Sequence, residues 1–275
     1  MAYHSILVHL DNEPACAVRC EIALRLAREH GSRLIGLAPT GRVQIPIDIA
    51  SSLFEPGYAI ASGHYLRTRA DGACAEFEAR AKAAGVSSVE LRVDEADHAE
   101  SVIEHAYGAD LVIVGQTDFE APLGVVNRDL PERAVLGSGR PVLVVPFAGR
   151  FDTLGATVLA AWNESREAAR AFSDALPLLQ RAARVILLTQ RQADEPEPSL
   201  EALLAWFARH SVHPQPAHEV SDLDFGDLLL SRAADMSVDL IVMGCYGHTR
   251  LTERVLGGAT RALLRQMTVP VLMSH

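Results

Sequence analysis

Two stretches of this 275-residue chain repeat each other at a constant spacing. The run Asp110-Leu-Val-Ile-Val-Gly115 lies 129 residues before Asp239-Leu-Ile-Val-Met-Gly244. The run Pro141-Val-Leu-Val also lies 129 residues before Pro270-Val-Leu-Met. Because the two offsets agree, the segments between them align without a gap. An internal duplication of this kind constrains the fold more than any single motif does.

The first strands of the two halves lie farther apart than the last ones. Leu7-Val8 and Leu159-Ala160 are 152 residues apart, so the first half carries 23 extra residues. We place them in residues 41–64, a poorly patterned stretch that contains prolines and glycines. The sequence therefore predicts two domains, residues 1–148 and 153–275.

Short apolar runs alternate with stretches of helical periodicity in both halves. The predicted strands are residues 6–10, 33–37, 88–93, 110–114, 141–145, 157–161, 185–189, 214–220, 239–243 and 270–273. The predicted helices are residues 15–30, 65–85, 98–107, 130–136, 166–181, 199–210, 225–236 and 259–266. This alternation predicts an α/β fold, with a parallel sheet covered by helices on both faces. Ligands of such sheets bind outside the carboxyl ends of the strands.

Glycines follow the strand at 239–243 in a fixed pattern. Gly244 is followed after two residues by Gly247, and after nine more by Gly257 and Gly258. Glycine lets backbone N–H groups approach an anion closely, and the N-terminus of the next helix adds partial positive charge. The pattern is typical of a phosphate-binding loop but matches neither the Walker nor the GxGxxG motif. The structural alternative is that the glycines only permit tight turns.

With Asp239-Leu-Ile-Val-Met before it and Thr268-Val-Pro-Val-Leu after it, this pattern resembles the nucleotide loop of the universal stress protein family. The resemblance covers nearly all of the chain. It implies two tandem Rossmann-like domains of the adenine-nucleotide alpha-hydrolase-like type, each a five-stranded parallel sheet flanked by helices. In that family two domains pair through their last strands. Here Val142–Val145 would pair with Val271–Ser274 and form an internal pseudo-dimer.

The resemblance implies ATP as the ligand, with ADP or AMP as alternatives and room for Mg²⁺. The phosphates would be held by backbone N–H groups and one hydroxyl, from Gly244, Gly247, Gly257, Gly258, Ala259 and Thr260. His248 and Arg250 would reach phosphate oxygens, or would simply be solvated loop residues. The base and ribose would lie near Ala161, Trp162, Asn163, Gln190 and Met243, although a tryptophan more often serves packing.

Asn163 departs from the family, which usually has aspartate at this position. An amide can hydrogen-bond a base or ribose but cannot make the same charged or metal contact. The first half departs further. By the 129-residue offset, Asp118, Arg128 and Asp129 stand where Gly247, Gly257 and Gly258 stand in the second half. Carboxylates would repel a polyphosphate, so we predict no ATP site of the family type in the first half.

Composition excludes several classes of function. The formal net charge is −10 and no basic stripe occurs, which argues against binding to nucleic acid or to an anionic membrane. No apolar run reaches the length of about 18 residues that a membrane span needs. The chain also lacks a signal-peptide pattern at its start. Its four cysteines form no CxxC pair; Cys16 and Cys20 lie four apart on a predicted helix. We expect free thiols, no zinc site and a cytoplasmic location.

These observations predict a stress-response sensor or regulator that binds an adenine nucleotide in its second half. No catalytic base or Walker lysine is evident, so enzymatic activity would be slow ATP hydrolysis at most, through His248 or Arg250. An alternative is a scaffold or a protein that binds an apolar metabolite, lined by the apolar residues of Ile45–Ile60. Protein partners and a homodimer stay open. Cys245 is either an oxidation-sensitive thiol of lowered pKa or an incidental small residue. Histidines 210, 213 and 218 are expected to be solvated.

Overall fold

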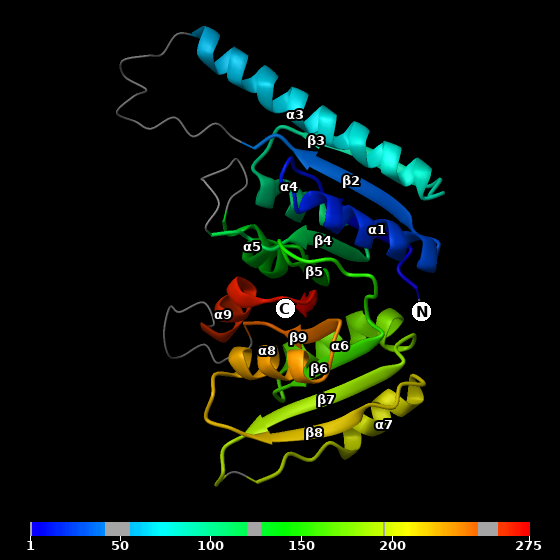
Figure 1. Cartoon of the computed structure of the whole chain (residues 1–275), viewed down its shortest axis with the longest axis vertical. Coiled ribbons are helices and arrows are strands. Elements are labelled where there is room, and N and C mark those ends of the chain that lie inside the picture. The colour runs from blue at the N-terminus through cyan, green and yellow to red at the C-terminus, as the bar shows by residue number, and fades with distance from the viewer. Residues whose placement is uncertain (1, 42–55, 120–127, 195, 247–257) are drawn as a thin grey trace. The chain divides into compact units, whose positions relative to one another are not determined.

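The computed structural model describes residues 2–41, 56–119, 128–194, 196–246 and 258–275. Strands and helices alternate along these ranges, which confirms the predicted α/β class. The chain divides into two units, an N-terminal unit of Tyr3–Ser138 and a C-terminal unit made chiefly of Gly139–His275 (Figure 1).

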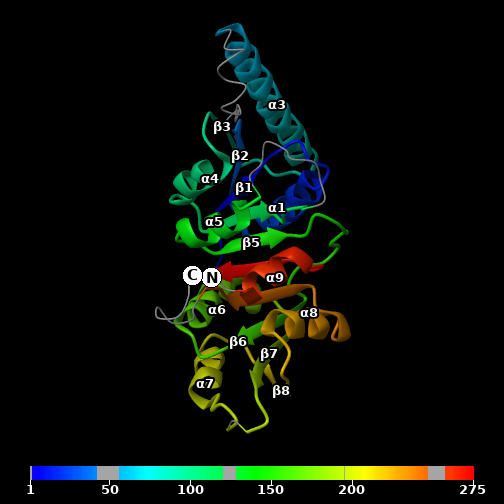
Figure 2. The same cartoon turned by 90° about the vertical axis from the view of Figure 1, so that its left-hand side faces the viewer.

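The N-terminal unit is built on four parallel strands in the spatial order β3-β2-β1-β4. These strands are β1 (Ser5–His9), β2 (Arg33–Pro39), β3 (Val89–Asp94) and β4 (Leu111–Gly115). One face of the sheet is covered by α1 (Cys16–His30) and α3 (Pro56–Ala83), and the other by α4 (His98–Ala106) and α5 (Leu130–Gly137) (Figure 2). Because helices cover both faces, β1 and β4 are almost wholly buried and consist of continuous apolar runs.

The C-terminal unit contains six strands in the spatial order β5-β10-β9-β6-β7-β8. They are β5 (Val142–Val145), β6 (Thr157–Trp162), β7 (Arg184–Arg191), β8 (Gln215–Val220), β9 (Leu240–Gly244) and β10 (Val271–Ser274). One face carries α6 (Arg166–Leu179) and α7 (Glu201–Arg209), the other α8 (Phe225–Asp235) and α9 (Gly258–Gln266) (Figure 2). All neighbours are parallel except β5 and β10, which pair antiparallel with Val144 opposite Val271. The predicted pairing of the last strands is therefore confirmed.

One predicted boundary is wrong. The structure begins α3 at Pro56, whereas the sequence pattern placed the helix start at Tyr65. In the sequence, Gly57 and Gly63 indicate irregular chain, yet both lie inside this long helix. Proline is tolerated in the first turn of a helix because its missing N–H would have no partner there. The remainder of the predicted insert, residues 42–55, lies outside the described residues.

The weakly patterned segment near residue 214 does form a strand. β8 lies at the edge of its sheet, where it pairs only with β7 within the described part of the chain. Its residues are largely exposed, and it contains Pro216. An edge strand tolerates proline and polar residues because only one side of its backbone joins the ladder. The position of β8 at the edge of the sheet thus explains why this strand lacks an apolar run.

Among the described residues, the helices are too short or too polar to cross a membrane.

Candidate functional site

The order of strands in the C-terminal unit creates a topological switch point between β6 and β9. From β6 the chain proceeds outward to β7 and β8, and then returns to the other side of β6 to form β9. In open parallel sheets, ligands bind beside the carboxyl ends of the strands that flank this point. Here β6 ends at Trp162 and β9 ends at Gly244, while α9 begins at Gly258. The glycine pattern therefore joins the carboxyl end of one of these strands to the N-terminus of a helix.

Gly244 lies against the first turn of α6. A Cβ atom added there would approach the backbone nitrogen of Ala168 to 2.3 Å and the carbonyl carbon of Glu167 to 2.4 Å. No side chain can be accommodated unless the helix moves, because both contacts are backbone atoms. Close helix packing thus accounts for a glycine at this position, independently of any phosphate.

The residues at the end of β6 and beside it differ in exposure. Ala161 and Met243 are buried in the sheet, whereas Trp162 is partly exposed. The Trp162 ring packs on Phe172 of α6, with ring centroids 5.6 Å apart. Trp162 therefore has a packing role beside the switch point, which agrees with the expectation that a tryptophan more often serves packing than contact with a base.

Asn163 is exposed directly after β6. Its Oδ1 accepts a hydrogen bond from Ser165 Oγ at 2.7 Å. Ser165 is the N-cap of α6, and its Oγ accepts a hydrogen bond from the backbone N–H of Ala168 at 3.1 Å. Such a cap satisfies a backbone donor that lacks a partner within the helix. Asn163 thereby supports the start of the helix that packs against Gly244.

Gln190 lies at the end of β7 and holds a neighbouring loop. Its side-chain nitrogen donates to the carbonyl oxygens of Ser221, at 2.9 Å, and Leu223, at 2.7 Å. Both amide hydrogens are thus used within the protein, which leaves Oε1 as the group for the predicted contact with a base.

The structure adds a polar pair at the same sheet edge that sequence reasoning missed. Thr189 Oγ1 and His218 Nδ1 share a hydrogen bond of 2.7 Å, and His218 Nε2 lies 3.1 Å from a Glu197 oxygen. His218 is exposed, as expected, and β7 and β8 place it opposite Thr189 in register. A histidine opposite a threonine could be found only by knowing that register. Across the described ranges, no group of three or more acidic, histidine or cysteine side chains could hold a metal ion.

The predicted phosphate-binding residues are only partly described. Gly247, His248, Arg250 and Gly257 lie outside the described residues. Gly258 and Ala259 begin α9, whose first-turn backbone N–H groups lack acceptors within the helix and can bind an anion. Thr260 is buried, with 5% of its surface exposed.

Cys245 follows Gly244 and is buried. Its Sγ donates to the carbonyl oxygen of Ser274 at 3.3 Å. Burial, together with the nearby Glu167 carboxylate, raises the pKa of this thiol. The interpretation of Cys245 as a thiol of lowered pKa is therefore wrong, because β9 and β10 enclose the side chain.

At the corresponding place in the N-terminal unit, an arginine fills the space. Arg19 of α1 is buried, and its Nη1 would lie 2.3 Å from a Cβ atom added to Gly115. Its Nε donates to the carbonyl oxygen of His9 at 2.7 Å, and its Nη2 pairs with Asp11 at 2.7 Å. Arg19 holds the pKa of Asp11 below its usual value although burial acts in the opposite direction.

Two buried histidines lie beside this ion pair. Nε2 of His9 and Nδ1 of His98 share a hydrogen bond of 2.7 Å. Burial lowers the pKa of both rings, to about 4 for His98. Both imidazoles are therefore neutral near pH 7. Sequence reasoning missed this pair because the two residues are 89 positions apart.

Comparison with known proteins relates this architecture to a protein family and to solved structures. The sequence model described as the universal stress protein family matches residues 2–146 and 156–275. A universal stress protein from Archaeoglobus fulgidus DSM 4304 has a TM-score of 0.75 at 15% identity, over 98% of this chain and 95% of that one. A functionally unknown protein from Pseudomonas aeruginosa PAO1 has a TM-score of 0.61 at 17% identity, over 99% and 92% of the two chains. No curated protein matched the sequence. The two matches together span most of the chain. The chain therefore belongs to the universal stress protein family, as a tandem of two such domains.

Proposed function

We propose that this stress-response protein binds one adenine nucleotide per chain, in its C-terminal unit, and acts as a sensor or regulator. The observation that carries the proposal is the position of the glycine pattern. It joins the carboxyl end of β9 to the N-terminus of α9, beside the switch point between β6 and β9. A polyphosphate there would meet backbone N–H groups of the glycine pattern and the positive end of a helix.

The described residues around this point fit such a ligand. Partly exposed Trp162 and exposed Asn163 offer an apolar surface and an amide at the end of β6 for the adenosine part. The first turn of α9 offers backbone N–H groups that have no acceptor within the helix, and these can bind the phosphates. Gly247, Gly257, His248 and Arg250 complete the proposed phosphate contacts from the sequence pattern.

The proposal assigns ATP as the nucleotide, with ADP or AMP as alternatives, and allows for Mg²⁺ beside the phosphates. It places no nucleotide of the family type in the N-terminal unit, because Asp118, Arg128 and Asp129 stand there in place of Gly247, Gly257 and Gly258. A cytoplasmic location is supported by the four free cysteines, since thiols persist in reducing compartments. Slow hydrolysis and an apolar ligand of residues 45–60 gain no support from the described residues.

Isothermal titration with ATP and ADP, each with and without Mg²⁺, tests the proposal. We expect a stoichiometry of one, and at least about a tenfold loss of affinity in Gly247→Asp, because the carboxylate repels phosphate and its Cβ blocks close approach.

The matched control is Gly108→Asp. Gly108 is exposed in the N-terminal unit, and a Cβ atom added there meets nothing within 4 Å. This variant adds the same charge elsewhere and should bind like the wild type. Absence of binding in the wild type, or equal affinities for the wild type and Gly247→Asp, would overturn the proposal.

A further inference from the structure

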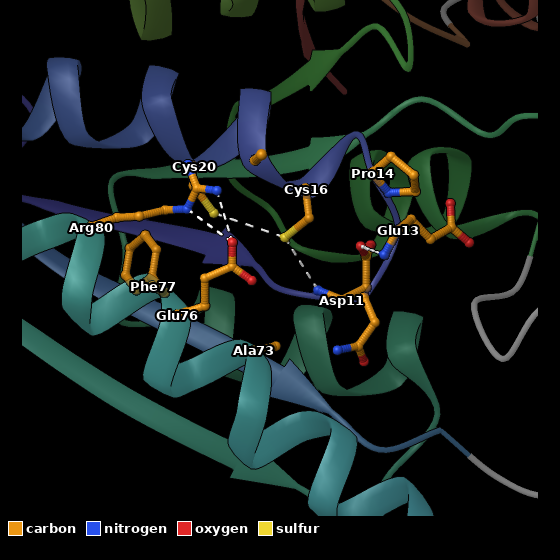
Figure 3. Close-up of a pocket in the computed structure, with 11 residues that line it drawn as sticks. Asp11, Glu13, Pro14, Cys16, Cys20, Ala73, Glu76, Phe77 and Arg80 are labelled. Carbon is orange, nitrogen blue, oxygen red and sulfur yellow. Dashed lines mark hydrogen bonds and ion pairs between the residues drawn. The ribbon is translucent and has the colours of Figure 1, made fainter.

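A pocket of about 280 Å³ opens between the start of α1 and the middle of α3, within the N-terminal unit (Figure 3). It is lined by residues of the turn before α1, by α1 itself and by α3: Asp11, Asn12, Glu13, Pro14, Cys16, Ala17, Cys20, Ala73, Glu76, Phe77 and Arg80. Both cysteines are buried, with 9% and 3% of their surfaces exposed, yet both line this pocket. A small molecule in the pocket would therefore lie beside both cysteines.

The two thiols face each other across one turn of α1. Their Sγ atoms are 3.8 Å apart and form a hydrogen bond (Figure 3). Residues four apart on a helix share one face, so this proximity follows from the helix itself. A dithiol whose sulfurs are already in contact needs little side-chain movement to react as a pair.

Cys16 is the better nucleophile of the two for structural reasons. It is the first residue of α1, where the helix N-terminus favours a negative charge. The backbone N–H of Asp11 also donates to its Sγ at 3.5 Å. The hydrogen bond with Cys20 lowers the pKa of the Cys16 thiol to about 7, and Arg19 acts in the same direction against burial and Asp11. The same hydrogen bond raises the pKa of Cys20, which therefore stays protonated.

The charges around the pocket select the class of reagent. Carboxylates of Asp11, Glu13 and Glu76 line it, and the guanidinium of Arg80 is paired with Glu76 at 2.8 Å. Because two of these carboxylates are paired with guanidinium groups, the lining has no excess positive charge to attract an anionic oxidant, whereas a small neutral one can enter. Hydrogen peroxide is such an oxidant, and it reacts with thiolates rather than with thiols.

We propose that Cys16 and Cys20 form a peroxide-reactive dithiol, in which Cys16 is the attacking thiol and Cys20 the resolving one. The Cys16 thiolate attacks one peroxide oxygen, the O–O bond breaks, and Cys16 sulfenic acid and hydroxide form. The Cys20 thiol then attacks the sulfenic sulfur, a disulfide forms, and water leaves with the sulfenic oxygen. Two thiols are oxidised and one hydroperoxide is reduced. The weakly capped start of α1, where Ala15 makes no side-chain cap bond, can move to bring the sulfurs to about 2.05 Å.

The test uses the full-length reduced chain and hydrogen peroxide, with the products read by intact and peptide mass spectrometry. We expect the wild type to lose about 2 Da, with a crosslink that joins Cys16 to Cys20. Cys20→Ser should instead accumulate a sulfenic acid at Cys16, trapped by a dimedone probe. Cys16→Ser should give neither product. Circular dichroism verifies that each variant is folded.

Cys74 is the internal control, because burial raises the pKa of its thiol to about 11. With neutral iodoacetamide at pH 7, Cys16 should react at least about tenfold faster than Cys74, since the thiolate is the reactive form. Its rate should rise through a midpoint near pH 7, set by the hydrogen bond with Cys20, by burial, and by Arg19 and Asp11, while Glu13 and Glu76 also face the pocket. Equal rates for the two cysteines would overturn the role of Cys16. Persistent sulfenic acid without a disulfide in the wild type would overturn that of Cys20.

Discussion

The two units have the same topology around their switch points, yet different groups fill the space there. In the C-terminal unit, Gly244 accommodates the backbone of α6. In the N-terminal unit, Gly115 accommodates the side chain of Arg19, which is paired with Asp11. The first-strand offset of 152 residues aligns Asp11 with Asn163. The N-terminal repeat, which has the aspartate, therefore also has the buried Arg19 that neutralises it.

This difference changes how the glycine pattern is interpreted. A glycine at the end of the fourth strand occurs in both repeats, including the one that is not predicted to bind ATP. Its presence is explained by close packing in both cases. The case for a nucleotide site therefore rests on the glycines farther along, Gly247, Gly257 and Gly258, which the N-terminal repeat replaces with charged residues.

The largest expected effect comes from the buried ion pair of the N-terminal unit. Arg19→Met should destabilise this unit by about 3–5 kcal/mol, because it leaves the Asp11 carboxylate buried without its partner. Both tryptophans, Trp162 and Trp206, belong to the C-terminal unit, so hydrogen exchange in β1 and α1 is the appropriate measurement.

Two variants sharpen this first prediction. Arg19→Met with Asp11→Asn should recover part of the loss, because no unpaired charge is then buried. Arg33→Met removes an exposed arginine that pairs with Glu90, and it should cost no more than about 1 kcal/mol. Equal costs for Arg19→Met and Arg33→Met would contradict a structural role for the buried pair.

The two strand-end glycines should differ in their sensitivity to alanine. Gly244→Ala should cost about 3 kcal/mol because the added Cβ meets backbone atoms, which only a shift of α6 can relieve. Gly115→Ala should cost less, about 2 kcal/mol, because it displaces the end of the Arg19 side chain, which His9 and Asp11 hold in place. Tryptophan fluorescence in denaturant follows the first variant, and hydrogen exchange follows the second. The comparison fails if Gly115→Ala proves the more damaging.

Acid should affect the N-terminal unit through its buried histidines. The folded pKa of His98 is about 4, below its ordinary value of 6.5. The unfolded chain therefore binds more protons below pH 6.5, and stability is lost as the pH falls from there toward 4. At pH 5 this linkage amounts to about 2 kcal/mol for one such histidine. Hydrogen exchange in β1 and α4 at pH 7 and pH 5 measures it, and His98→Gln should reduce the difference between the two pH values.

The smallest effect separates two roles of Gln190. If its amide mainly holds the loop between β8 and α8, Gln190→Ala should cost about 1 kcal/mol through the loss of two hydrogen bonds to carbonyl oxygens. The affinity of the Gln190→Ala variant for ATP should then differ from that of the wild type by less than about threefold. Fluorescence in denaturant and titration calorimetry measure the two quantities on the same variant. Unchanged stability with a large loss of affinity would show the opposite role.

The sequence by itself determined the duplication and the succession of strands and helices, whereas the pairing of Val142–Val145 with Val271–Ser274 was implied by the family resemblance and its antiparallel direction came from the structure. The duplication and the succession depend on local periodicity and on spacing along the chain, which are visible in a single sequence. The start of α3 at Pro56 was missed because glycine and proline indicate irregular chain on local grounds, although proline is tolerated in the first turn of a helix.

Only the tertiary structure decided what fills the strand ends. Arg19 reaches Gly115, and His9 reaches His98 across 89 positions, through contacts that no periodicity encodes. The pocket beside Cys16 and Cys20 likewise exists because α3 packs near α1. The sequence could place two thiols on one helical face, but their environment depends on residues from another helix. Burial and the neighbouring charges set the chemistry of such groups, and both are properties of the folded chain.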